Sequence, residues 1–187
     1  MRIVSGSAKG RKLKTPEGLD TRPTTDRVKQ SIFNIILRYV FDAKVLDLFG
    51  GTGNLGIEAI SRGAQSCTFS EENKKTYEIL CTNIKDLDFR EKSFTYNRDS
   101  FKVLSQLATQ EKKFDIVFLD PPYGKGYIER SIEAIDRLNL LEEDALIVSE
   151  YDSVDNVPER VGSFSIFRTE KYGRVRVSFW RRETGNE

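Results

Sequence analysis

The sequence of 187 residues contains no histidine and only two cysteines, Cys67 and Cys81. It therefore cannot carry a Ser-His-Asp or Cys-His catalytic set, a four-cysteine zinc site or a disulfide framework. No run approaches the ~18 apolar residues that a membrane span requires, and the N-terminus Met-Arg-Ile-Val-Ser-Gly lacks the apolar stretch of an export signal. These absences predict a cytoplasmic protein with reduced thiols, no metal site and no membrane partner.

The composition, with 38% hydrophobic and 11% aromatic residues, is typical of one globular domain with a small appendage. The net charge of +1 conceals a segregation of charge along the chain. Residues 1–44 hold ten Lys and Arg against four Asp and Glu, residues 45–167 hold 14 against 22, and residues 168–187 hold six against three. Basic ends around an acidic middle suggest that the ends contact a polyanion, although a merely solvated surface remains open.

From residue 44 onward, short apolar runs alternate with stretches of helical periodicity. This alternation predicts βαβ units, and hence a doubly wound, mostly parallel α/β sheet with helices on both faces. After residue 160 two runs flank Lys171-Tyr-Gly173, which predicts an antiparallel hairpin that closes the sheet. Strands are expected at 44–49, 66–70, 93–97, 114–119, 145–150, 163–170 and 174–180. Helices are expected at about 25–39, through 57–60 to 62, and at about 73–87, 101–108 and 128–138.

A glycine-rich turn follows the first of these strands. Gly51-Thr52-Gly53-Asn-Leu-Gly56 matches the G-x-G-x-x-G pattern at the position where it has meaning, between a strand and a helix. Glu71 lies 20 residues after Gly51 and directly follows the next strand, where an acidic side chain can bind ribose hydroxyls. The pattern predicts an adenosine-type cofactor, with the neighbouring Glu72 left open as the ribose ligand.

Asp47 favours S-adenosylmethionine over a dinucleotide. A carboxylate inside an apolar strand is costly to bury without a partner, and the α-ammonium group of a methionine moiety would be one. A dinucleotide would instead bring a pyrophosphate, which a nearby carboxylate repels. The alternative role for Asp47 is to cap nearby backbone amides. Asp99, which follows the third strand, is placed to meet the adenine amino group.

Asp120-Pro121-Pro122-Tyr123 ends the fourth strand, at the edge of an open α/β sheet where ligands bind. The two prolines fix the backbone and direct stiff carbonyl acceptors at a group that only donates hydrogens, such as an exocyclic amine. The Tyr123 ring can stack on a base. Acceptors at Asp120 and the Pro121 carbonyl would hold both N–H bonds of the amine and free its lone pair to attack an activated methyl group.

These two motifs together, Asp47–Gly53 and Asp120–Tyr123, resemble those of class I S-adenosylmethionine methyltransferases that act on base amines. The upstream block Thr21–Ile35, preceded by Gly10-Arg-Lys-Leu-Lys14, is similar to the bacterial RsmD family. The similarity extends from about Arg2 to Trp180. It implies a Rossmann-like sheet of seven strands and methylation of the N2 amine of a guanine in small-subunit ribosomal RNA.

The resemblance also assigns roles along the chain. It implies a basic N-terminal extension over residues 1–43, packed on a methyltransferase domain over residues 44–187. The basic residues of the extension, with Lys29 among them, would form a phosphate-contacting arm over the cleft. The expected catalytic residues are Asp120, Pro121, Pro122 and Tyr123; the expected cofactor ligands are Asp47, Phe49, Gly51, Thr52, Gly53, Glu71, Asp99 and Ser100; and the expected RNA-binding residues are Lys9, Arg11, Lys12, Lys14, Arg22, Thr24 and Arg27.

Other functions remain open at this point. The same tetrapeptide serves methyltransferases for other base amines, such as adenine N6 in DNA, although the chain has no room for a separate target-recognition domain. A nicotinamide-dependent oxidoreductase would use the same glycine turn, but a histidine or Tyr-x-x-x-Lys pair for its proton is missing. A non-catalytic RNA-binding protein is the last alternative. We expect a monomer whose substrate is ribosomal RNA in an assembled particle, because the arm is short and the net charge is near zero.

Overall fold

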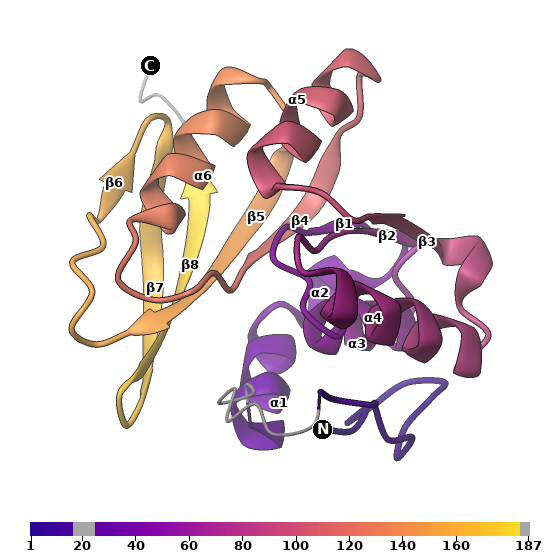
Figure 1. Ribbon diagram of the computed structural model, residues 1–187. Helices are drawn as coiled ribbons and strands as arrows, with labels where there is room; N and C mark the ends of the chain where they lie inside the picture. Colours follow the sequence, from indigo (N-terminus) through magenta and orange to yellow (C-terminus); the bar gives the residue numbers. More distant parts are fainter. Residues whose placement is uncertain (17–24, 184–187) are drawn as a thin grey trace.

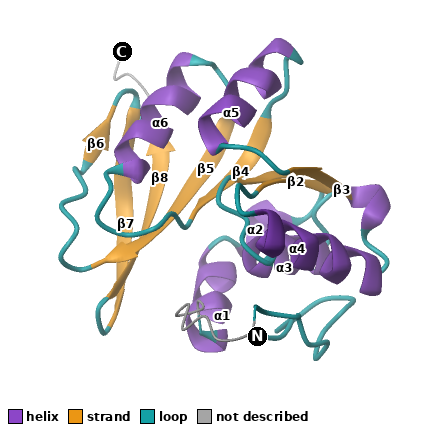
Figure 2. Cartoon of the chain, in the orientation of Figure 1, coloured by secondary structure: helices purple, strands orange, loops and turns teal. Residues whose placement is uncertain are grey.

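The computed structural model describes residues 1–16 and 25–183 and has an α/β architecture (Figures 1 and 2). The helices are α1 (Asp26–Ile35), α2 (Leu37–Val40), α3 (Asn54–Ser61), α4 (Lys74–Asp86), α5 (Ser100–Thr109) and α6 (Tyr127–Arg137), with a 3-10 turn at Arg90–Lys92. The strands are β1 (Lys44–Asp47), β2 (Ser66–Ser70), β3 (Ser93–Tyr96), β4 (Phe114–Leu119), β5 (Leu141–Asp152), β6 (Arg160–Val161), β7 (Phe164–Tyr172) and β8 (Val175–Arg182).

The strands form one sheet in the order β3-β2-β1-β4-β5-β8-β7-β6. The first five strands in this order are parallel, and the last three are antiparallel, which confirms the predicted class and its closing hairpin. The sheet has eight strands where seven were expected. The additional strand is the two-residue β6, which pairs only with the start of β7 and is too short to show a period in the sequence.

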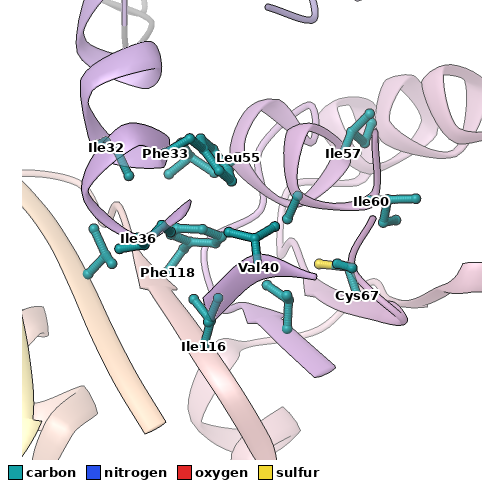
Figure 3. Packing of buried hydrophobic residues seen from close by; sticks show 14 of the residues in the cluster. Ile32, Phe33, Ile36, Val40, Leu55, Ile57, Ile60, Cys67, Ile116 and Phe118 are labelled. Atoms are coloured by element: carbon teal, nitrogen blue, oxygen red, sulfur yellow. The ribbon is translucent and has the colours of Figure 1, made fainter. Parts of the chain in front are cut away.

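Helices cover both faces of the sheet, as the alternating pattern predicted (Figure 1). Helices α1 to α4 lie on one face and α5 and α6 on the other. One buried apolar cluster fills the space beneath the first group, where Phe33, Leu55 and Phe118 meet (Figure 3). A second cluster lies beneath α5 and α6 around Leu104, Ile132 and Trp180. The central strands are therefore buried on both faces, which explains their nearly continuous apolar sequence.

The helix expected over 25–39 is divided in two. Its first part, α1, begins at the N-cap Thr25, whose hydroxyl accepts a hydrogen bond from the Val28 amide. The backbone leaves helical geometry at Ile36 (φ −94°, ψ 12°), and α2 follows as a single turn. Asn73 and Asp99 cap α4 and α5 in the same way as Thr25 caps α1.

The N-terminal segment is an integral part of the first apolar cluster. Ile3 and Leu13 are buried in it together with residues of α1 and α3. The Ser7 amide donates to the Ser61 carbonyl, and the Ala8 amide donates to the Ser61 hydroxyl. The basic extension is thus held against the C-terminal end of α3 by its own apolar residues and backbone. Within residues 1–16 and 25–183, none of the helices has the length and apolar character needed to cross a membrane.

Candidate active site

Four acidic side chains mark the edge of the sheet where the parallel strands end. Asp47 is the last residue of β1, Glu71 follows β2, Asp120 follows β4, and Glu150 lies near the end of β5. Because the carboxyl ends of parallel strands share one edge, all four residues lie at the sheet edge where α/β folds bind ligands. In the described ranges, no group of three or more His, Cys, Asp and Glu residues is arranged to hold a metal ion.

The glycine turn between β1 and α3 is open at one glycine and tightly packed at another. Gly51 has a φ of 53°, and a Cβ there would meet no atom within 4 Å, so its backbone is open to a ligand. Gly53 has a φ of 94°, and a Cβ there would lie 2.5 Å from Cδ1 of Ile57. Only glycine satisfies both the left-handed conformation and this close contact. The turn thus places its backbone against α3 on one side and leaves it accessible on the other.

Glu71 is the acidic residue that contacts the turn. Its Oε2 accepts from the Gly51 amide at 3.0 Å, and its Oε1 accepts from the Asn73 amide at 2.7 Å. Burial raises the pKa of Glu71 above its ordinary value, while these two backbone hydrogen bonds oppose the rise. The exposed Glu72 has no such contact with the turn. Each Glu71 oxygen retains a second lone pair, so the carboxylate can still accept hydrogen bonds from hydroxyl groups.

Asp47 is 2% exposed, and its Oδ2 accepts a hydrogen bond of 2.9 Å from the Gly56 amide near the start of α3. Desolvation raises the pKa of Asp47 to about 7, and the nearby Glu71 carboxylate adds to the rise. Both of the roles considered for Asp47 from the sequence are therefore compatible with its position. It caps a backbone amide, and its buried charge would be stabilised by a cationic ligand.

The other residues expected to bind the cofactor lie around the same turn. The buried Thr52 accepts a hydrogen bond through its carbonyl from Asn83 at 2.9 Å, and the Ser100 hydroxyl donates to the Leu48 carbonyl at 2.9 Å. Asp99 is partly exposed and accepts from the Lys102 amide as the N-cap of α5. The half-buried Phe49 ring lies 5.7 Å from the ring of Tyr127. The Ser100 hydrogen bond thus links the start of α5 to the segment that follows β1.

The tetrapeptide after β4 opens into a cavity of about 340 Å³. Pro121, Pro122 and Tyr123 line it on one side, and residues 154–158 line it on the other. Tyr123 is 38% exposed, so its ring is accessible to a ligand. Burial and the nearby carboxylates of Glu150 and Asp47 raise the pKa of Asp120 well above its ordinary value. Asp120 thus directly precedes the segment that lines the cavity and carries the accessible Tyr123 ring.

Glu150 was not anticipated from the sequence. It lines the cavity and is 3% exposed, and its Oε1 accepts a hydrogen bond of 3.4 Å from the Tyr123 hydroxyl. A sequence signal was present, because Glu150 follows an apolar run near the end of a central strand, as Asp47 and Asp120 do. Unlike those two residues, Glu150 is not part of a tetrapeptide or glycine-turn motif that would mark it as functional.

The described part of the basic arm lies along α3 and α4. Lys9, Arg11, Lys12 and Lys14 are all exposed. Arg11 donates to the Asp86 carbonyl, and the Lys14 ammonium lies 2.7 Å from the Asp86 carboxylate. Both basic side chains therefore contact the C-terminal end of α4. The arm reaches the glycine turn through Asn83, which bonds both to the backbone of Lys14 and to the carbonyl of Thr52. Arg27 is exposed in the first turn of α1, whereas Arg22 and Thr24 lie outside the described residues.

The prediction that Lys29 belongs to the phosphate-contacting surface is wrong. Lys29 is fully buried, and its ammonium lies 3.2 Å from the Glu58 carboxylate and donates to the Arg2 carbonyl and to Oδ1 of Asn54. Desolvation lowers the pKa of Lys29, while the Glu58 charge opposes this effect. Lys29 therefore joins the N-terminal segment, α1 and the first residue of α3 from inside the protein.

Comparison with known proteins places this site in a family. The model of the family described as "Conserved hypothetical protein 95" matches residues 1–181. The Escherichia coli K12 protein "Ribosomal RNA small subunit methyltransferase D" is 33% identical, over 100% of this chain and 92% of its own. The chain belongs to the RsmD family.

Two further similarities cover nearly the whole chain. YlbH of Bacillus subtilis is 42% identical over 97% of this chain and 99% of its own. The solved structure of yhhF from Escherichia coli superposes with a TM-score of 0.87 at 34% identity and covers 98% of both chains. The similarity of this RsmD family member to its relatives therefore includes both the N-terminal segment and the antiparallel hairpin.

Proposed function

We propose that this protein transfers the methyl group of S-adenosylmethionine to the exocyclic N2 amine of a guanine in small-subunit ribosomal RNA. Membership of the RsmD family supports methylation of ribosomal RNA. The observation that carries the proposal is the position of two groups at one sheet edge. The glycine turn follows β1, and Glu71 and the Asp120–Tyr123 segment follow β2 and β4, the two strands that flank β1.

The residues around the glycine turn fit the cofactor. When bound, S-adenosylmethionine supplies a methyl group that is already activated by the sulfonium charge. Asp47 would hold the α-ammonium group, directly or through water, because its buried carboxylate lacks a cationic side chain in the contacts described above. Glu71 would accept hydrogen bonds from the ribose hydroxyls, and Asp99 would accept one from the adenine amine. Phe49, Gly51, Thr52, Gly53 and Ser100 would form the surface of the pocket around these three acids.

The residues after β4 fit a base amine. Tyr123 offers its exposed ring for stacking, an interaction worth ~1–3 kcal/mol per base. Asp120 and the Pro121 carbonyl would accept the two N–H bonds of the amine, which keeps its lone pair directed at the methyl carbon. Methyl transfer would form the N–C bond as the C–S bond breaks, and Asp120 or water would accept the proton that the amine releases. Pro122 keeps this stretch of backbone stiff.

The basic N-terminal arm supplies contacts to RNA in this proposal. Its exposed side chains would contact phosphate groups, which positions the RNA without reading its sequence. The arm is short, and two of its charges already lie against α4. We therefore infer that the monomeric enzyme acts on an assembled ribosomal particle, whose shape provides the contacts that the arm alone does not. The arm residues are Lys9, Arg11, Lys12, Lys14, Arg22, Thr24 and Arg27.

A comparison of substrates tests this function. Methyl transfer from radiolabelled S-adenosylmethionine is measured on naked small-subunit RNA, on the assembled subunit and on duplex DNA, and the product nucleoside is identified by mass spectrometry. We expect N2-methylguanosine from the assembled subunit at the highest rate. Transfer to DNA alone would overturn the substrate class, and equal rates on naked and assembled RNA would remove the particle requirement.

A further inference from the structure

Glu150 lies where the edge of a bound base would meet the protein. It comes from β5, whose Ser149 pairs with Leu119 of β4, so Glu150 and Asp120 follow paired residues on adjacent strands. Glu150 also lines the cavity that Tyr123 faces. A base stacked on Tyr123 with its amine at Asp120 would therefore present the adjoining ring atom to Glu150.

The surroundings of Glu150 favour a hydrogen-bond donor on that ring atom. The carboxylate is 3% exposed, so few water molecules can reach it. Its Oε1 accepts a hydrogen bond from the Tyr123 hydroxyl at 3.4 Å, and a carboxylate can accept several hydrogen bonds at once. The neighbouring Asp120 is a second acid, and two carboxyl groups side by side resist full ionisation. A donor from the ligand would relieve this repulsion, whereas an acceptor would add to it.

The purine bases differ at this ring atom. Guanine carries a hydrogen on N1 next to its N2 amine, so this edge presents only donors to two carboxyl groups. In adenine and in 2-aminopurine N1 carries a lone pair, which a carboxylate repels. We propose that Glu150 is a specificity-determining residue that selects guanine by accepting its N1–H, beside the amine held at Asp120. This inference rests on the proposed function and adds to it the group that identifies the base.

A base analogue separates this role from catalysis. 2-Aminopurine retains the reactive N2 amine of guanine but has an acceptor at N1. The guanine that the wild-type enzyme methylates is first located, and small-subunit RNA carrying 2-aminopurine at that position is prepared by ligation. Methyl transfer gives kcat/KM for each RNA. We expect the wild-type enzyme to prefer guanine by ~10²-fold or more, since a site built to pair with a donor rejects an analogue that lacks it.

The Glu150→Gln variant should reduce this preference to within ~10-fold, because the amide can donate to N1 of 2-aminopurine. It should lower kcat/KM on guanine and raise it on 2-aminopurine. A purely structural role for Glu150 would lower both values together. The matched control is Glu143→Gln, which alters an exposed glutamate at the opposite end of β5 and should retain the wild-type preference.

The possible outcomes are distinguishable. An unchanged preference in a Glu150→Gln variant that still binds S-adenosylmethionine would overturn the role of Glu150 and leave the proposed function intact. If the variant does not fold, the wild-type kcat/KM values on the two RNAs still test the proposal. Equal values would exclude recognition of N1–H. If the wild-type enzyme methylates neither RNA nor the assembled subunit, the proposed function itself fails.

Discussion

The two sides of the crevice differ in how their polar groups are held. On the proposed cofactor side, backbone amides hold both acids. Asp47 accepts from the Gly56 amide, and Glu71 accepts from the amides of Gly51 and Asn73. On the base side, Tyr123 is 38% exposed and its hydroxyl donates to the side chain of Glu150 at 3.4 Å. The cofactor side is thus preorganised by backbone, whereas the base side depends on side chains around an open cavity.

This difference suggests that the two sides have different roles in the proposed function. A small molecule of constant structure can be bound by fixed backbone groups, which lose little freedom when it binds. A base that arrives on a large RNA must enter from outside and needs an accessible pocket. If the comparison is correct, substitutions on the cofactor side should change cofactor affinity, and substitutions on the base side should change turnover.

The largest effect is expected for Asp120→Ala. This variant should bind S-adenosylmethionine and RNA like the wild type but lose ~10²-fold or more in kcat, because the Asp120 contact matters mainly in the transition state. Calorimetry gives the cofactor affinity, and single-turnover methyl transfer gives the rate. Tyr123→Phe serves as the mild comparison, because it retains the stacking surface. A loss of cofactor affinity equal to the loss in rate would show that the two sides do not work separately.

Glu71→Ala should have the next largest effect, and it should change the affinity for S-adenosylmethionine rather than kcat. We expect S-adenosylmethionine binding to weaken by ~1.5–3 kcal/mol, through the loss of charge-assisted hydrogen bonds to the ribose. Part of this loss would come from the Gly51 and Asn73 amides, which lose their acceptor. Glu72→Ala is the matched control and should bind the cofactor normally. The reverse result in a titration of both variants would assign the ribose to Glu72.

The position of Glu71 beside the glycine turn could be predicted from the sequence. Asp47, the glycine turn and Glu71 lie within one βαβ unit, so their spacing along the chain fixes their arrangement in space. Asp120–Tyr123 could be placed for the same reason, at the end of a recognisable strand. The alternation of strands and helices likewise predicted the sheet and its hairpin, but a two-residue strand such as β6 leaves no periodic pattern.

Glu150 and Lys29 show why the rest could not be predicted in the same way. The role of Glu150 depends on β5 lying beside β4, a contact between distant parts of the chain. Lys29 was assigned to the surface because of its charge, although it stands three and four residues before the buried Ile32 and Phe33. Its partner Glu58 belongs to another helix, and this pairing, together with the hydrogen bonds to the Arg2 carbonyl and Asn54, makes burial of the charge tolerable. Long-range pairing of charges is not visible in local sequence.

A smaller effect concerns the pH dependence of cofactor binding. The pKa of Asp47 is raised to about 7, so the carboxyl group is largely protonated at pH 6 in the free protein. A cationic ligand requires the ionised form of Asp47, so at pH 6 binding must first release the proton from its carboxyl group. The affinity for S-adenosylmethionine should therefore fall about fivefold from pH 7 to pH 6. Calorimetry in buffers of different ionisation enthalpy measures that proton. The Asp47→Asn variant should bind weakly, with no such pH dependence.

The same pKa predicts the opposite trend for stability. Because the folded pKa of Asp47 is raised above 3.8, protonation of this group favours the folded state, and its contribution is lost as the pH rises through about 7. The ligand-free wild type should therefore gain stability relative to Asp47→Asn as the pH falls from 8 to 6. Thermal unfolding of both proteins tests this. Parallel curves for the two proteins would mean that Asp47 is already ionised at pH 6.

The smallest effect is expected outside the crevice, in the basic arm. Lys9 and Lys12 have no ion-pair partner in the described ranges, whereas Lys14 and Arg11 lie against Asp86. Replacing Arg11, Lys12 and Lys14 with Ala should weaken RNA binding and reduce its salt dependence by a slope of ~0.7–0.9 for each phosphate group that the arm no longer neutralises. Lys12→Ala alone should reduce the slope more than Lys14→Ala, because Asp86 already neutralises part of the Lys14 charge.

Binding of small-subunit RNA is measured across a salt series, with Lys112→Ala, just before β4 at the opposite sheet edge, as the control. Cofactor affinity should stay unchanged in every arm variant, and a change there would mean that the link through Asn83 to Thr52 transmits the substitution into the glycine turn.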